Sequence, residues 1–314
     1  MHTFAAPRPA RALSCLSALA VGDAFGSQFF AAANRRLVEG RELPPGPWRW
    51  SDDTEMAASV HAEAVRGEGV DPDRLAGSFA RHHDADRGYG AATGRLLGRV
   101  REGGDWRTLA AELFEGSGSF GNGAAMRVAP LGAWYADDPG RAAREAAVSA
   151  RVTHTHPEAV DGAVAVAVAA ALAARREPVG PGPFLDGVVE GLRPGRVREA
   201  VGAARGLLVS ADPLVAAADL GNGSRVSALD TVPFALWVAA RHGGVVSGAR
   251  AGGGGFAPAM WAAVAAGGDM DTTCAIVAGI LGAGLPGGRV PAAWAERTEE
   301  LPGWALADEE GLGG

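Results

Sequence analysis

The spacing of apolar residues is the feature that most constrains the fold of this 314-residue chain. Wherever a clear period exists it is helical, as in residues 56–65, 159–174 and 274–284. No convincing run of alternating β-branched residues marks a strand. The sequence therefore predicts an all-α fold, with a single compact helical domain over residues 12–290 and an acidic, partly ordered tail over residues 291–314.

The N-terminus and the longest apolar run bear on membrane attachment. Residues 12–21 predict a first core helix that ends at Gly22, followed by an irregular stretch up to Trp50. The alternative is a signal peptide cleaved near Ala20, which the short, serine-interrupted apolar region disfavours. Residues 162–174 predict a buried helix, because a membrane span needs about 20 apolar residues.

Composition narrows the classes of function. Hydrophobic residues make up 47% of the chain and the mean hydropathy is +0.05, which is typical of a soluble globular protein. All 29 basic residues are arginine, so a lysine Schiff base is excluded. The net charge of −7 argues against a broad nucleic-acid-binding face. Cys15 and Cys274 form no disulfide framework, so we expect a reducing, cytoplasmic compartment. We expect no membrane partner, and a monomer is favoured although the sequence does not determine the oligomeric state.

Two stretches carry carboxylates at predicted helix starts. Asp52 and Asp53 follow a proline-rich loop, and Asp269 and Asp271 follow a pair of glycines. The simplest interpretation is two independent helix caps, with Asp52 as N-cap and Glu55 completing a capping box. That interpretation leaves a second carboxylate unexplained at each place, because neighbouring carboxylates repel unless a cation lies between them.

Together the two stretches form a set of hard oxygen donors. With the hydroxyls of Ser51 and Thr272 they offer six oxygen-bearing side chains and no soft ligand. Such a set suits Mg²⁺ or Mn²⁺ rather than zinc. Four carboxylates are enough to hold two ions about 4 Å apart.

A glycine-rich loop, residues 116–123, runs straight into a predicted helix. Backbone N–H groups of such a loop, aimed along a helix N-terminus, make a ready anion site, and Arg127 could add further donors. The loop is neither a Walker loop nor a dinucleotide fingerprint, and alone it is a weak signal.

Other polar clusters have simple structural explanations. Tyr89, next to glycines, fits either a ligand contact or a surface turn. Thr155 or His156 is expected to cap the helix that starts at Pro157. One more group could be a metal cluster but fits the last turn of a helix better, since the dipole there favours positive charge; it consists of His82, His83, Asp84 and Asp86.

Five motifs occur in order at predicted helix boundaries. They are Gly22-Asp23-Ala24-Phe25-Gly26; Trp50-Ser51-Asp52-Asp53-Thr54-x-Met56; Gly121-Asn122-Gly123-x-x-Met126-Arg127-x-x-Pro130-Leu131-Gly132; Thr153-His154-x-His156-Pro157; and Gly267-Gly268-Asp269-x-Asp271-Thr272. The ordered set resembles the ADP-ribosylglycohydrolases, which include dinitrogenase reductase-activating glycohydrolase and the ADP-ribosyl-arginine and ADP-ribosyl-serine hydrolases. The resemblance covers roughly residues 12–285.

The resemblance implies a helical domain of that type with a binuclear magnesium or manganese centre in a cleft. The implied activity is hydrolysis of the glycosidic bond between ADP-ribose and a modified protein side chain or small molecule. Asp53 and Asp269 are the expected catalytic residues, since a metal-bound carboxylate is the nearest base to the attacking water. The implied metal ligands are Ser51, Asp52, Asp53, Asp269, Asp271 and Thr272.

The resemblance also implies substrate contacts. The glycine-rich loop would receive the diphosphate, His154 would contact the distal ribose or phosphate, and Tyr89 and Phe120 would pack against ribose or adenine. The expected substrate-binding residues are Tyr89, Gly118, Ser119, Phe120, Gly121, Asn122, Gly123, Arg127 and His154.

The chain departs from the family pattern at two positions. Phe30 stands where many members carry a glutamate that gates or orients the substrate, and Ser51 stands where threonine is common. Two alternatives therefore stay open. One is a non-catalytic relative that binds ADP-ribose, and the other is a two-metal phosphoesterase that acts on a nucleotide diphosphate.

Overall fold

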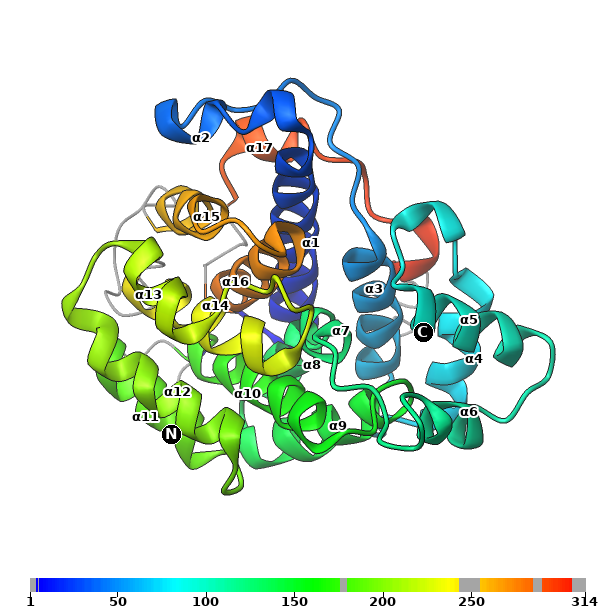
Figure 1. The fold of residues 1–314 in the computed structure, drawn as a ribbon. Helices are drawn as coiled ribbons and strands as arrows, with labels where there is room; N and C mark the ends of the chain where they lie inside the picture. Colours follow the sequence, from blue (N-terminus) through cyan, green and yellow to red (C-terminus); the bar gives the residue numbers. More distant parts are fainter. Residues whose placement is uncertain (1–3, 5, 176–179, 243–254, 285–289, 307–314) are drawn as a thin grey trace.

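The computed structural model describes residues 4, 6–175, 180–242, 255–284 and 290–306, which form an all-helical fold as predicted (Figure 1). Within these ranges β-structure is limited to isolated bridges. From its glycines we expect residues 243–254 to be a flexible loop, and from its prolines and glycines residues 177–183 to be a linker. That loop, part of that linker, and residues 307–314 lie outside the described ranges. The α-helices are α1 (Arg8–Ser27), α2 (Leu37–Gly40), α3 (Asp52–Val65), α4 (Pro72–His82), α5 (Ala91–Arg101), α6 (Trp106–Glu112), α7 (Gly123–Met126), α8 (Ala129–Trp134), α9 (Pro139–Arg151), α10 (Pro157–Ala173), α11 (Pro181–Glu190), α12 (Arg196–Gly206), α13 (Pro213–Leu220), α14 (Ala228–His242), α15 (Phe256–Ala265), α16 (Met270–Gly284) and α17 (Ala292–Ala295).

Helices α1 and α16 lie side by side at the centre of the molecule (Figure 1). A Cβ atom on Gly22 would overlap the carbonyl oxygen of Cys274, and one on Gly26 would overlap the backbone of Met270. The glycines therefore serve close helix packing, and α1 continues through them to Ser27. The expectation that the first helix ends at Gly22 is wrong for this reason.

The N-terminal helix is also the one segment of the described chain that is long and apolar enough to cross a membrane by length and composition. It spans Arg8–Phe30 in that test, and 67% of its most apolar window is buried inside the protein. Its packing against α16 is that of a core helix.

Helix α10 is buried along almost its whole length, as its apolar run predicts. His156 is its N-cap, accepting a hydrogen bond from the amide of Glu158, and Pro157 occupies the first helical position. Helices α8, α9, α14 and α16 pack around it. Helices α4, α5 and α6 gather on the far side of α3 (Figure 1).

Two stretches are more ordered than the sequence suggests. The segment before Trp50, expected to be irregular, contains α2 and the 3₁₀ turns Gln28–Phe30 and Ala32–Asn34. Near the C-terminus Trp294 is 4% exposed and packs against Phe25 and Trp48. Residues 291–306 are thus part of the packed structure rather than a tail, whereas the domain boundary at residue 290 stays a prediction.

Candidate metal centre

The N-terminus of α3 is capped by Ser51, whose Oγ accepts a hydrogen bond from the amide of Asp53 at 3.2 Å. The expected capping box of Asp52 and Glu55 is wrong. The Glu55 carboxylate instead accepts hydrogen bonds from the Tyr89 hydroxyl at 2.7 Å and the amide of Asp84 at 3.0 Å. Asp52 and Asp53 lie inside the first helical turn, and neither is used as the cap.

Asp23, on the neighbouring helix α1, is fully buried and holds the start of α3 in place. Its Oδ2 accepts hydrogen bonds from the amide of Ser51 at 2.8 Å, the amide of Thr54 at 3.1 Å and the hydroxyl of Thr54 at 2.6 Å. A carboxylate at a helix N-terminus is favoured by the helix dipole, which helps to keep Asp23 buried.

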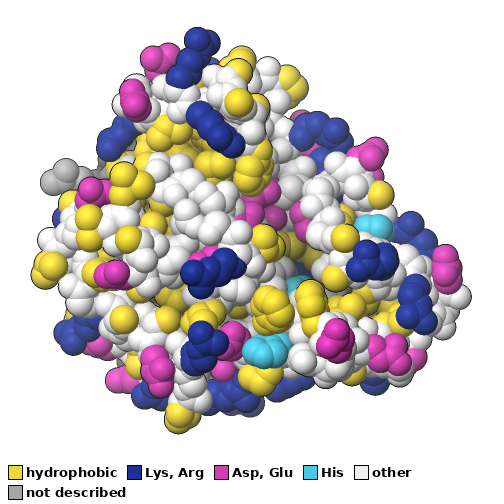
Figure 2. All heavy atoms as spheres, viewed as in Figure 1, with side chains coloured by type: hydrophobic (Ala, Val, Ile, Leu, Met, Phe, Trp, Pro, Cys, Tyr) yellow, Lys and Arg dark blue, Asp and Glu magenta, His cyan; other side chains and the backbone are white. Residues whose placement is uncertain are grey.

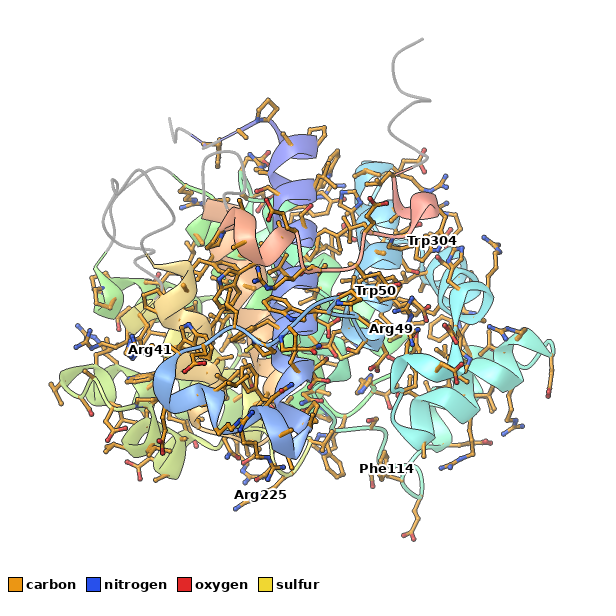
Figure 3. All side chains as sticks on the ribbon, turned by 90° about the horizontal axis from the view of Figure 1, so that it is seen from above. Arg41, Arg49, Trp50, Phe114, Arg225 and Trp304 are labelled. Carbon is orange, nitrogen blue, oxygen red and sulfur yellow. The ribbon has the colours of Figure 1, made fainter. Side chains whose placement is uncertain are left out.

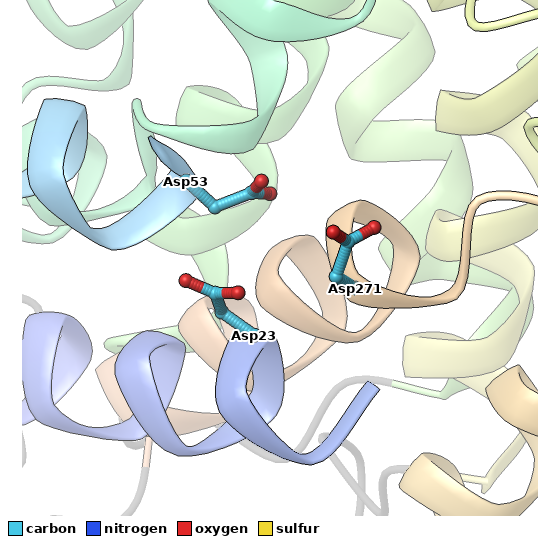
Figure 4. Close-up of side chains that lie close together, drawn as sticks. All are labelled: Asp23, Asp53 and Asp271. Atoms are coloured by element: carbon cyan, nitrogen blue, oxygen red, sulfur yellow. The ribbon is translucent and has the colours of Figure 1, made fainter. Parts of the chain in front are cut away.

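Three helices bring carboxylates together at one point. Asp23, Asp53 and Asp271 each offer an oxygen atom within 4.8 Å of the others, and their side chains converge in Figure 4. Among the described residues this is the one group that fits a metal ion, and the stretch from His82 to Asp86 does not form another. The acidic stretches around α3 and α16 therefore meet, so the interpretation as two unrelated helix caps is wrong.

Burial is the main cause of the raised pKa values around this acidic cluster, and neighbouring carboxylates add to it. Burial raises the pKa of Asp53 well above its usual range, and the nearby Asp23 and Asp271 raise it further. Burial, and then the charge of Asp269, raises the pKa of Asp271. Burial, and then Asp23, raises the pKa of Asp52 to about 7. Without a cation the cluster therefore favours protonation. A bound divalent ion would offset the repulsion between the charged carboxylates.

Asp53 shows that the residues fit such an ion. Its Oδ2 accepts hydrogen bonds from the hydroxyls of Ser51 at 3.1 Å and Thr272 at 3.4 Å. Its Oδ1 is buried and has no hydrogen-bond partner in the described part of the chain. A buried carboxylate oxygen left unpaired is costly, and in a set of hard oxygens Mg²⁺ or Mn²⁺ is the natural partner.

The glycine-rich loop was expected to lead into one continuous helix. It leads instead into the short helices α7 and α8. Because α7 has only four residues, its dipole contributes little to anion binding. Gly118 has a φ of +73°, and a Cβ there would overlap the Thr155 hydroxyl. Glycine at this position therefore allows the loop to lie directly against the segment before α10.

His154 lies beneath the loop. A Cβ on Gly121 or Gly123 would approach its Nε2 to 3.2 or 3.1 Å. The side chain is 3% exposed, and its Nδ1 lies 2.7 Å from the Thr153 hydroxyl. Burial, together with the charge of Arg127, lowers the pKa of His154 to about 3, so the imidazole is neutral at pH 7.

Asn122 joins the loop to the acidic cluster. Its side-chain amide donates to Asp269 Oδ2 at 2.7 Å and to the Thr231 hydroxyl at 3.0 Å. From the other side the carbonyl of Asn222 accepts a hydrogen bond from the amide of Asp269 at 3.0 Å. The sequence Gly-Asn-Gly occurs at residues 121–123 and 221–223 and is too short to be called a repeat. Both segments thus form a hydrogen bond with Asp269.

Arg127 is placed differently from its expected role as an anion donor. It is 0% exposed, its Nη2 donates to the carbonyl of Ser149 at 3.0 Å, and its guanidinium lies 4.5 Å from the centre of the Phe79 ring. The turn between α7 and α8 directs the side chain into the core. Arg127 therefore does not reach the surface of the loop.

The other predicted substrate contacts differ in their exposure. Phe120 is 39% exposed and its ring centre lies 5.1 Å from that of Phe114, whereas Ser119 is 6% exposed and its Oγ accepts from the amide of Gly121. Phe30, at the family's glutamate position, is 47% exposed. On the face drawn in Figure 2, acidic side chains lie in a central hollow between apolar surfaces.

Asp23 is the member of the cluster that sequence reasoning missed. It belongs to the motif Gly22-Asp23-Ala24-Phe25-Gly26, which alone assigns it no role. The signal was present, because a carboxylate between two glycines in an otherwise apolar helix must be buried with a partner.

An open cavity of about 740 Å³ lies elsewhere, lined by residues of α12, α13 and α14. It includes Asn222, but none of Asp23, Asp53 and Asp271 lines it. The site is therefore located by its side-chain chemistry and not by the size of a cavity.

Comparisons with known proteins agree with this geometry. The family model of the ADP-ribosylglycohydrolases matches residues 5–312. An uncharacterized protein of Archaeoglobus fulgidus is 30% identical over 307 residues, covering 91% of each chain. ADP-ribosylhydrolase ARH3 of Homo sapiens is 33% identical over 193 residues, which is 54% of this chain and 52% of that protein, so the match spans about half of that relative. The solved structure of an ADP-ribosylglycohydrolase-related protein complex has a TM-score of 0.66 and 29% identity, covering 96% of this chain and 97% of that one.

Proposed function

Because the chain belongs to the ADP-ribosylglycohydrolase family, we propose that it hydrolyses the glycosidic bond between ADP-ribose and a modified acceptor, releasing free ADP-ribose. The single observation that carries this proposal is the convergence of Asp23, Asp53 and Asp271, where Asp53 Oδ1 is buried and has no partner among the described residues. The acceptor, a protein side chain or a small molecule, is part of the proposal.

The proposed metal ligands surround Asp53. Two divalent ions, Mg²⁺ or Mn²⁺, would activate a water molecule and stabilise negative charge as it develops. Asp23 joins the ligands proposed from sequence, because its carboxylate lies in the same group. The set is Asp23, Ser51, Asp52, Asp53, Asp269, Asp271 and Thr272.

The chain's own residues would then act as follows. The loop with Gly118 and Gly123 would bind the diphosphate through backbone N–H groups. Asp53 or Asp269 would accept one proton of the attacking water as its oxygen bonds to the ribose carbon. The acceptor would leave with the electron pair of the broken bond and take up a proton. His154 would position the loop and not transfer a proton, because its pKa of about 3 keeps it neutral.

The test is a product assay on purified protein with Mg²⁺ or Mn²⁺. Its substrates are ADP-ribosylated arginine and serine peptides, O-acetyl-ADP-ribose and ADP-ribosylated nucleic acid. We expect ADP-ribose from at least one substrate, with activity lost in EDTA and in Asp53→Asn. Asp73→Asn is the matched control, since Asp73 pairs with Arg107 on the exposed surface.

Other products would replace this proposal with one of its two alternatives. Release of AMP in place of ADP-ribose would identify a phosphoesterase. Tight ADP-ribose binding with no turnover of any substrate would identify a non-catalytic relative, which the exposed Phe30 also fits.

A further inference from the structure

The C-terminal segment from Arg297 to Trp304 lies against the loop that leads into α3, and its contacts are specific. The amide of Trp48 donates to the carbonyl of Arg297 at 2.6 Å, and the amide of Glu299 donates to the carbonyl of Trp48 at 2.9 Å. The indole of Trp50 donates to the carbonyl of Glu300 at 3.1 Å. The residues directly before Ser51 are thus held by chain about 250 positions away.

Arg87 links this C-terminal segment to the same loop. Its guanidinium pairs with both oxygens of Glu299, at 2.7 and 2.9 Å, and donates to the carbonyl of Trp50 at 3.0 Å. It also lies over the Trp50 ring, 3.4 Å from the ring centre. Only 10% of the Arg87 side chain is exposed, so this pair is better shielded from water than a surface ion pair.

The turn that carries Arg87 also lies over the first turn of α3. Tyr89 donates to Glu55, and a Cβ on Gly88 would lie 3.9 Å from Asp52 Oδ1. On the other side of the turn, the ring of His82 stacks on Trp304 with ring centres 3.7 Å apart. Figure 3 shows Trp50 and Trp304 on the face seen from above, where the C-terminal segment crosses.

We propose that Glu299 is a positioning residue for the metal centre: by fixing Arg87 against the Trp50 carbonyl, it sets the placement of Ser51, Asp52 and Asp53. This inference rests on the proposed function. Second-layer contacts of this kind orient ligating carboxylates, and their loss commonly weakens metal binding. A loop that is free to shift by a fraction of an ångström would hold the same ligands less well.

The experiment is calorimetric titration of MnCl₂ into the metal-free full-length protein. We expect Glu299→Gln to raise the dissociation constant for Mn²⁺ about three- to tenfold. Glu299→Asp keeps the charge on a shorter side chain and should give a smaller increase. The matched control is Asp73→Asn, which breaks the equally bidentate Arg107–Asp73 pair between α4 and α6.

The melting temperature in EDTA separates positioning from general stability. Both Glu299→Gln and Asp73→Asn are expected to lower it, but only Glu299→Gln should change the Mn²⁺ dissociation constant. If Glu299→Gln does not fold, Glu299→Asp carries the comparison. An unchanged constant in the Glu299 variants, with normal binding by the wild type, overturns this inference and leaves the proposed function intact. Absence of Mn²⁺ and Mg²⁺ binding by the wild type overturns both.

Discussion

Asp23 on α1 accepts hydrogen bonds from both the amide and the hydroxyl of Thr54 on α3, at 3.1 and 2.6 Å. The same carboxylate lies within ligand-sharing distance of Asp53 and Asp271. We therefore propose two separable roles for Asp23, as a hydrogen-bond acceptor for the start of α3 and as a metal ligand through its charge.

Two substitutions at Asp23 separate these roles. Asp23→Asn keeps an oxygen acceptor for Ser51 and Thr54 but loses the charge, so it should fold and bind Mn²⁺ at least about tenfold more weakly. Asp23→Ala also leaves buried donors unpaired and should lower the free energy of unfolding by about 1–3 kcal/mol. Calorimetric titration and urea unfolding measure the two effects. Wild-type Mn²⁺ affinity in Asp23→Asn would show that the residue is only a cap.

The two asparagines that hold Asp269 should differ in their effect on metal binding. Asn122 uses its side chain, so Asn122→Ala removes the hydrogen bond to Asp269 Oδ2 and should weaken Mn²⁺ binding about tenfold. Asn222 uses its backbone carbonyl, which Asn222→Ala retains, so this variant should lose stability but little affinity. The same titration compares them, and equal loss of affinity would contradict the assignment.

Close packing of α1 on α16 makes a glycine substitution costly there. Gly22→Ala would push a methyl group into the backbone of α16 and should lower the free energy of unfolding by about 1–3 kcal/mol. The control is Gly98→Ala in α5, where a Cβ meets nothing within 4 Å and helix propensity favours alanine. Urea unfolding of both variants tests this. A Gly22→Ala protein as stable as the wild type would show that the helices can separate without penalty.

His61 should make the protein sensitive to acid. It is fully buried in α3, and burial lowers its pKa to about 4, below the ordinary value of 6.5. The unfolded chain therefore binds the proton more readily than the folded one. The contribution of neutral His61 to the free energy of unfolding is complete above pH 6.5 and is lost as the pH falls towards 4. When the pH falls from about 7.5 to 4.5, the free energy of unfolding should decrease in both proteins. The decrease should be roughly 2 kcal/mol smaller in His61→Gln than in the wild type. Parallel pH profiles of the two proteins would contradict this.

Sequence predicts some parts of this molecule and not others, for physical reasons. Helical periodicity was enough for the all-α fold. The expectation that Asp53 and Asp271 meet rested on the paired carboxylates together with the ordered motifs of the family resemblance. Periodicity does not show which way a side chain in a turn points, so Arg127 was expected to donate to an anion at the glycine-rich loop and instead lies in the core. The glycines in α1 were interpreted as a helix end but are sites of close packing. Because of that interpretation, Asp23 was given no role.

The C-terminal segment shows a second limit. Its acidic composition suggested a partly ordered tail, although Trp294 and Trp304 are large aromatic residues, which are commonly buried. The contact of Glu299 with Arg87 joins positions 212 residues apart, and no local pattern predicts it. Long-range pairs of this kind become visible only in the folded chain.

The most direct measurement of the central claim is the anomalous difference density of crystals soaked in Mn²⁺ and ADP-ribose. We predict Mn²⁺ peaks about 2 Å from Asp53 Oδ1, between α1, α3 and α16, with the diphosphate against the glycine-rich loop. Peaks confined to other carboxylates, or none near Asp53 under conditions where ADP-ribose is bound, would contradict it.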